Sequence, residues 1–92
     1  MTASAASGTA KQQDAPRVTL LTRKACHLCE PVRAVVTAVC ADGGHSWREL
    51  DVDSDPDLRS EYGEQVPVVL VDGEFLASYS LDAPTLSTAL RR

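Results

Sequence analysis

The chain has 92 residues, a net charge of -4 and an isoelectric point near 4.9. This acidic balance argues against nucleic acid or an anionic membrane as the main partner, because both call for a basic surface. The three cysteines form an odd and sparse set, unlike a secreted disulfide scaffold of this size, so we expect a cytoplasmic protein.

Residues 1–16 are rich in alanine, serine, threonine and glutamine and carry almost no large apolar side chain. Such a segment cannot bury enough surface to offset the entropy lost on ordering, so we predict a disordered N-terminal tail. It shows neither the basic start nor the apolar run of a signal peptide. No stretch approaches the ~18 apolar residues of a membrane span. The remaining residues, 17–92, are predicted to form one domain.

The domain is expected to begin with a strand and a long helix. Residues 18–22 are β-branched and apolar, as in a strand covered on both faces. Apolar side chains then recur three and four residues apart between Leu28 and Val39, which predicts one buried helix face. Gly43-Gly44 should end this helix, because glycine adopts the left-handed capping conformation at little cost.

The sequence of the second half predicts an edge strand at 46–52 and a short helix at 56–62. It then predicts a hairpin at 66–79 and a closing helix at 81–92. Asp72-Gly73 marks the hairpin turn, and Asp55 and Asp82 are suited to cap the two helices. The first strand–helix–strand crossover requires two parallel strands, and the hairpin adds an antiparallel pair. We therefore expect an α/β fold of order βαβαββα, with a four-stranded mixed sheet and helices on both faces.

Cys26 and Cys29 carry the main chemical signal, because they fall where the first strand gives way to the helix. Free amide groups and the helix dipole stabilise a thiolate at a helix N-terminus and lower its pKa. Cys26 is expected there, with Cys29 one turn inside the helix. Cys26 would attack a disulfide, and Cys29 would then displace the reduced product.

Three features together resemble glutaredoxin-like proteins of the thioredoxin-fold superfamily, from about residue 17 to the C-terminus: Cys26-His27-Leu28-Cys29, Val66-Pro67 and the Asp72-Gly73 hairpin. The resemblance implies a glutaredoxin-type, thioredoxin-like fold. It also implies a monomeric thiol-disulfide oxidoreductase that reduces disulfides of proteins or mixed disulfides of small thiols. No tightly bound cofactor is expected; glutathione or another low-molecular-weight thiol would be the co-substrate.

The resemblance also implies a substrate site around the cysteines. Val66-Pro67 would be a cis peptide against them, with the backbone of Val66 docking a substrate strand, although the base rate for X-Pro bonds alone favours trans. Arg23 falls where glutaredoxins keep a basic residue that meets the thiolate and a glutathione carboxylate; the alternative is a solvated surface arginine. Ser80 and Asp82 would contact the γ-glutamyl end of glutathione.

Two further positions affect this site. Protonated His27 would favour the Cys26 thiolate and make the Cys26–Cys29 couple more oxidising. The alternative is that His27 faces solvent and has no effect on the redox potential. Ala77-Ser78 stands where glutaredoxins have a glycine pair. Because side chains would crowd that place, we expect weak glutathione-dependent activity.

Other functions compete with this interpretation. Zinc could be bound by Cys26, Cys29, Cys40 and His45, but a helix would separate Cys29 from Cys40 by about 16 Å, so we expect no metal site. Cys40 is predicted to be a small apolar residue, with a regulatory thiol as the alternative. A noncatalytic interaction module, or an iron–sulfur cluster scaffold, is the alternative to the oxidoreductase.

Overall fold

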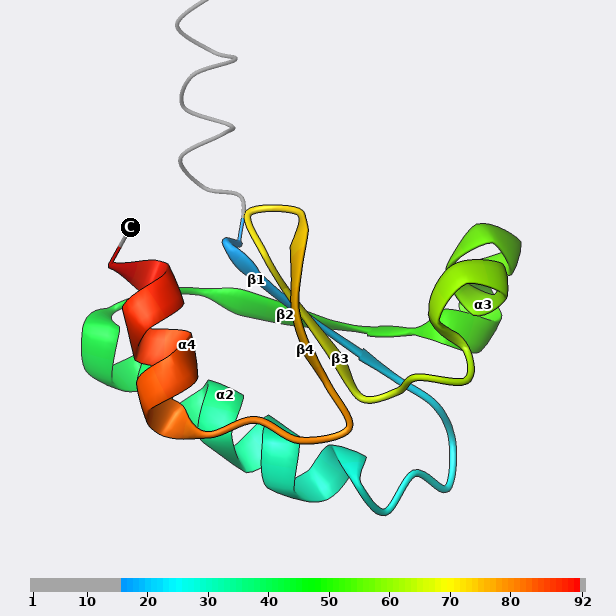
Figure 1. Cartoon of the computed structure of the whole chain (residues 1–92), viewed down its shortest axis with the longest axis horizontal. Helices are drawn as coiled ribbons and strands as arrows, with labels where there is room; N and C mark the ends of the chain where they lie inside the picture. The colour runs from blue at the N-terminus through cyan, green and yellow to red at the C-terminus, as the bar shows by residue number, and fades with distance from the viewer. Residues whose placement is uncertain (1–15, 92) are drawn as a thin grey trace, which may run out of the picture.

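The computed structural model describes residues 16–91 and consists of a four-stranded mixed sheet with helices packed on it (Figure 1). The strands are β1 (Val18–Thr22), β2 (Trp47–Asp51), β3 (Val68–Val71) and β4 (Glu74–Ser78). The helices are α2 (Cys29–Gly43), α3 (Pro56–Tyr62) and α4 (Ala83–Leu90), with the 3-10 turn η1 (Val52–Ser54) ahead of α3. The predicted order βαβαββα is confirmed. The predicted disordered tail lies, up to residue 15, outside the described residues.

The strand order in the sheet is β2-β1-β3-β4. β1 pairs parallel with β2 and antiparallel with β3, so that it is covered by a strand on each side. All five residues of β1 are buried, which agrees with its β-branched and apolar sequence. β2 lies at the edge and is half-buried or exposed, as its mixed sequence predicts.

Side chains of β1 alternate between two apolar clusters. Leu20 belongs to the larger cluster, which α2 and α4 cover on one face of the sheet. Leu21 belongs to the smaller cluster, against which Leu58 and Tyr62 of α3 pack. The predicted placement of helices on both faces is therefore confirmed, and Figure 1 shows α2 and α4 on the side of the sheet away from α3.

The buried face of α2 differs in part from the predicted one. It consists of Cys29, Val32, Val36 and Cys40, spaced three and four residues apart. Leu28 was predicted to belong to it, but its side chain is 53% exposed, because Leu28 caps the helix instead of lying within its first turn. Gly44, with a φ of 73°, ends the helix in the left-handed conformation, as the glycine pair predicts.

The remaining turns also follow their sequence signals. The Asp55 carboxylate accepts hydrogen bonds from the N–H groups of Asp57 and Leu58 and so caps α3. Asp72 and Gly73 both have a positive φ, of 54° and 85°, as expected of a two-residue hairpin.

Candidate functional site

Cys26 and Cys29 form a disulfide, with their Cα atoms 5.4 Å apart. Cys26 lies in the turn before α2 and is half-buried, whereas Cys29 is 1% exposed. The N–H of Cys29 donates to the carbonyl of Cys26 at 3.3 Å and closes this turn. Cys29 is therefore the first residue of α2, and the prediction that it lies one turn inside the helix is wrong. Cys26 precedes the helix by three residues.

The chain enters this turn through an unusual backbone conformation. Ala25 has a φ of 58°, in the left-handed region that residues with a side chain seldom adopt. This conformation directs the chain from the end of β1 into the cysteine turn. Cys26 is thus held at the surface, while Cys29 points into the apolar base of α2.

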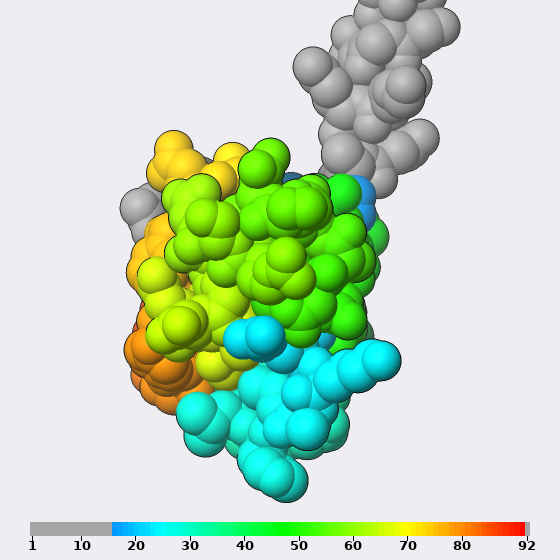
Figure 2. Space-filling model, turned by 90° about the vertical axis from the view of Figure 1, so that its right-hand side faces the viewer, coloured from blue at the N-terminus to red at the C-terminus, as the bar shows by residue number. Residues whose placement is uncertain are grey.

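A hollow of about 490 Å³ opens in front of Cys26. Three parts of the chain line it: residues 23–28 of the β1–α2 loop, Asp53 of η1, and Gly63 and Val66 after α3. In Figure 2 the β1–α2 loop, in cyan, lies directly beneath the green surface of α3 and the yellow-green segment that follows it. The fold therefore brings Arg23, His27 and Val66 together around Cys26.

The Val66-Pro67 peptide is cis, as the family resemblance implies. Val66 is half-buried and lines the hollow, whereas the side chain of Pro67 is buried beneath it. The carbonyl of Pro67 accepts a hydrogen bond from the N–H of Tyr79 at 2.9 Å. Tyr79 also donates its hydroxyl to the carbonyl of Glu64 at 3.1 Å and is 52% exposed, so it spans this segment from outside.

Arg23 reaches across the hollow, although 40% of its side chain is exposed. Its Nε and Nη2 groups donate to the two carboxylate oxygens of Asp53, each at 3.1 Å. Its Nη1 group donates to the carbonyl of Gly63 at 3.0 Å. The guanidinium therefore ties the loop that carries Cys26 to η1 and to the end of α3.

Asp53, which binds Arg23, is a residue of the site that the sequence did not predict. Its partner Arg23 lies thirty residues earlier, and no local pattern pairs them. One signal was available: β1 and β2 are parallel, so the segments that follow them emerge at the same end of the sheet.

Two predicted residues lie outside the hollow. Asp82 accepts a hydrogen bond from the N–H of Thr85 at 2.9 Å and caps α4. Hydrogen bonding by the Thr85 side chain and then by its N–H keeps the pKa of Asp82 below its usual value. Ser80 is exposed in the link between β4 and α4. Ala77 and Ser78 are half-buried in β4, opposite Val69 and Val68 of β3.

A polar network supports the helix that carries Cys29. Arg33 of α2 donates to both carboxylate oxygens of Glu49 on β2, at 2.8 Å each, and to Glu30 at 2.7 Å. The hydroxyl of Thr22 donates to Glu49 at 3.0 Å. The guanidinium of Arg33 lowers the pKa of Glu49 below its ordinary value. The network thus joins α2 to the carboxyl ends of β1 and β2.

This network predicts a pH-dependent part of the stability. Because the folded pKa of Glu49 is depressed, its contribution is complete above the ordinary pKa of 4.5 and is lost as the pH falls through the folded value. Glu49→Gln should lower the unfolding free energy at pH 7 by about 0.5–1 kcal/mol, since both partners are about one-third exposed. The difference from wild type, measured by urea unfolding, should shrink at pH 3. The exposed Glu61→Gln serves as control, and an equal difference at both pH values would contradict the pairing.

The structure contains no cluster of zinc ligands within the described residues. Within residues 16–91, no three His, Cys, Asp or Glu side chains come together as a metal site requires. Cys40 is fully buried near the far end of α2, where burial raises the pKa of its thiol. Its predicted packing role is confirmed.

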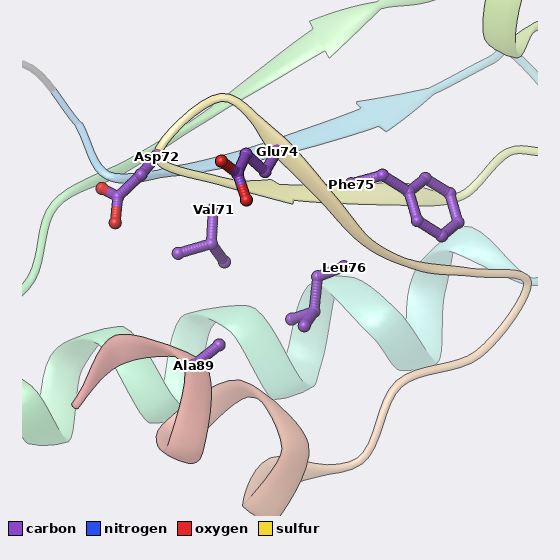
Figure 3. A pocket seen from close by; sticks show the side chains of 6 residues that line it. All are labelled: Val71, Asp72, Glu74, Phe75, Leu76 and Ala89. Atoms are coloured by element: carbon purple, nitrogen blue, oxygen red, sulfur yellow. The ribbon is translucent and has the colours of Figure 1, made fainter. Parts of the chain in front are cut away.

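A second hollow, of about 220 Å³, lies between the β3–β4 hairpin and α4 (Figure 3). Val71 and Leu76 point toward Ala89, and the carboxyl groups of Asp72 and Glu74 lie at the hairpin end. Arg17 pairs with Asp72 at 2.9 Å, so the start of β1 is tied to this end of the molecule. The hollow contains no cysteine or histidine.

The helices of the described part of the chain are all too short or too polar to cross a membrane.

Comparisons with known proteins agree with this architecture. A family model described as a glutaredoxin-like domain matches residues 17–91. The uncharacterized protein Rv0508 of Mycobacterium tuberculosis is 33% identical over 82 residues, which cover 84% of each chain.

Solved structures extend the comparison. The crystal structure of protein XcR50 from X. campestris is similar with a TM-score of 0.66 and 30% identity, over 80% of this chain and 95% of that one. A glutaredoxin from Archaeoglobus fulgidus has a TM-score of 0.57 at 16% identity, over 87% of this chain and 91% of that one, which shows the fold alone. The thioredoxin-like fold expected from the sequence is confirmed.

Proposed function

Because the chain belongs to the family of glutaredoxin-like domains, we propose that it is a thiol-disulfide oxidoreductase. Its substrates would be disulfides in proteins or mixed disulfides of small thiols. The observation that carries the proposal is the unequal exposure of the two sulfur-bearing residues: Cys26 is half-buried at a hollow, whereas Cys29 is 1% exposed beneath it. Such a pair offers one sulfur to a substrate and protects the other.

The reaction is a sequence of two thiol-disulfide exchanges. The Cys26 thiolate attacks one sulfur of the substrate disulfide; a bond forms between them as the substrate S–S bond breaks, and the departing thiolate takes a proton from solvent. The Cys29 thiolate then attacks the sulfur of Cys26. This step forms the Cys26–Cys29 disulfide and releases the second substrate thiolate, and two electrons have passed to the substrate.

The surroundings favour Cys26 as the attacking group. It lies just ahead of the positive end of the α2 dipole and next to the cationic Lys24 in the wall of the hollow. Cys29 is only 1% exposed, and burial disfavours a thiolate. Cys29 therefore suits the second, intramolecular step, in which proximity to the Cys26 sulfur speeds the attack.

Val66 gives the hollow a second wall. It lines the same hollow as the cysteine loop and lies two residues before the first residue of β3. An extended segment of a substrate protein would lie along this wall, held by main-chain hydrogen bonds, with its disulfide over Cys26. Glutathione or another low-molecular-weight thiol would return the Cys26–Cys29 disulfide to the dithiol.

Reduction of insulin by excess dithiothreitol tests the proposal. Wild-type protein should accelerate the reaction about tenfold or more over dithiothreitol alone, because a positioned thiolate reacts faster than a free thiol. The matched control is the double variant Cys26→Ser with Cys29→Ser, which should give the rate of the reductant alone. If folded, reduced wild-type protein gives no acceleration, the oxidoreductase proposal fails and the noncatalytic module takes its place.

A further inference from the structure

The hollow in front of Cys26 contains a guanidinium, and each of its three nitrogens already donates one hydrogen bond within the chain. Nε and Nη2 of Arg23 bind the Asp53 carboxylate at 3.1 Å, and Nη1 binds the carbonyl of Gly63 at 3.0 Å. Both partners line the same hollow as Cys26. A substrate that reaches Cys26 therefore meets an internal ion pair in place of a free arginine.

We propose that Asp53 sets the substrate selectivity of Cys26 by occupying Arg23. Its carboxylate takes the place that a carboxylate of a small anionic disulfide would otherwise take. The preferred substrates are then uncharged disulfides, including those presented by the main chain of another protein, and anionic small disulfides such as glutathione disulfide gain nothing from Arg23. The inference rests on the proposed function and names the substrate class of the same site.

The geometry of the pair supports this role. A two-pronged arginine–carboxylate contact is among the stronger polar contacts in proteins, and an incoming carboxylate could make the same two-pronged contact with Arg23 only by displacing Asp53. Such an exchange replaces one carboxylate by another and brings little net gain. Asp53 is also part of the chain, which gives it a high effective concentration over any free anion.

Asp53 is held in place by its own turn. Its N–H donates to the carboxylate of Asp51 at 2.9 Å, and the hydroxyl of Ser54 donates to the carbonyl of Asp51. These contacts shape η1 independently of Arg23. The Asp53 carboxylate is therefore presented to Arg23 by a preformed turn, and little ordering entropy opposes the pair.

Lys24 also lines the hollow and attracts anions. Its ammonium is a single point charge on an exposed side chain, without the planar fork of arginine. It is present in wild type and in each variant below. Its effect therefore cancels when the variants are compared with one another.

The test measures a single exchange at Cys26 in the Cys29→Ser background. The Cys26 thiolate attacks glutathione disulfide, which is net anionic, or hydroxyethyl disulfide, which is uncharged. In each case a mixed disulfide with Cys26 forms as the S–S bond of the probe breaks and one small thiolate leaves. Mass spectrometry follows the second-order rate of mixed-disulfide formation, and the quantity compared is the ratio of the anionic to the uncharged probe.

Asp53→Asn should raise this ratio about tenfold, because the freed guanidinium can make a charge-assisted contact with the anionic probe. The rise should decrease in high salt, which screens the attraction. Asp57→Asn, the matched control, removes the same charge from an exposed position on α3 and should leave the ratio as in wild type. Arg23→Gln combined with Asp53→Asn should also show no rise.

An unchanged ratio in Asp53→Asn would overturn the proposal, and so would a rise that persists without Arg23 or that appears equally in Asp57→Asn. Asp53→Ala is a second variant with the same expectation, and thermal unfolding verifies that each protein is folded. The readout needs only one exchange at Cys26. Failure of insulin reduction would therefore remove the proposed function without altering this ratio, and the two failures are distinguishable.

Discussion

Replacing Cys26 by serine is expected to abolish disulfide reduction, lowering the rate to that of the reductant alone. Cys26 is the sulfur that faces the hollow, and serine at that position is too weak a nucleophile to attack a disulfide. The insulin assay measures the loss. Cys40→Ser is the matched control, because Cys40 is fully buried and lies outside the hollow, so this variant should keep most of the wild-type activity.

Cys29→Ser should behave differently from Cys26→Ser. The first exchange at Cys26 remains possible, but the resolving thiol is missing, so turnover on protein disulfides should stop at the mixed disulfide. A small thiol in solution could still release a small substrate from Cys26. Equal loss of the first exchange in both variants, or full activity in Cys26→Ser, would contradict the assigned roles.

The second large effect concerns stability. Leu86 of α4 is fully buried in the cluster between the sheet and α2, so Leu86→Ala should lower the unfolding free energy by about 3 kcal/mol. The melting temperature should fall by more than about 10 °C for a domain of this size. Urea and thermal unfolding measure both quantities. Thr88→Ala changes an exposed position of the same helix and should alter stability by less than about 0.5 kcal/mol.

A small effect of Leu86→Ala would mean that α4 does not close the core. The domain is short, and the apolar cluster between the sheet and the two helices provides most of its buried side chains. Without α4, the face of the sheet that carries this cluster would be exposed.

Local sequence signals predicted most of the fold because each had a local physical cause. The β-branched and apolar sequence of β1 follows from burial on both faces, and Asp72-Gly73 follows from the positive φ that a tight hairpin turn requires. The caps at Asp55 and Asp82 follow from the free N–H groups of a helix start. The cysteine motif was recognised in the same way, since its spacing is local.

The predictions that failed depended on geometry that local spacing does not determine. Leu28 fits a helical apolar pattern, but the turn that closes at Cys29 leaves it outside the helix and exposed. The Arg23–Asp53 contact joins two loops that only the parallel pairing of β1 with β2 brings to one end of the sheet. The position of Asp82 away from the hollow likewise depends on where α4 begins.

The most direct test of the account is the identity of the cysteine that captures a substrate. Reduced Cys29→Ser protein, which retains Cys26 and Cys40, is mixed with insulin, treated with an alkylating agent at neutral pH while it is folded, freed of excess agent and digested without reduction. We predict that mass spectrometry of the folded protein finds the intermolecular disulfide at Cys26. Alkylation of Cys40 should appear only in unfolded controls, because Cys40 is fully buried. An intermolecular disulfide at Cys40, or none at Cys26 in folded protein, would contradict the role of Cys26 as the attacking group.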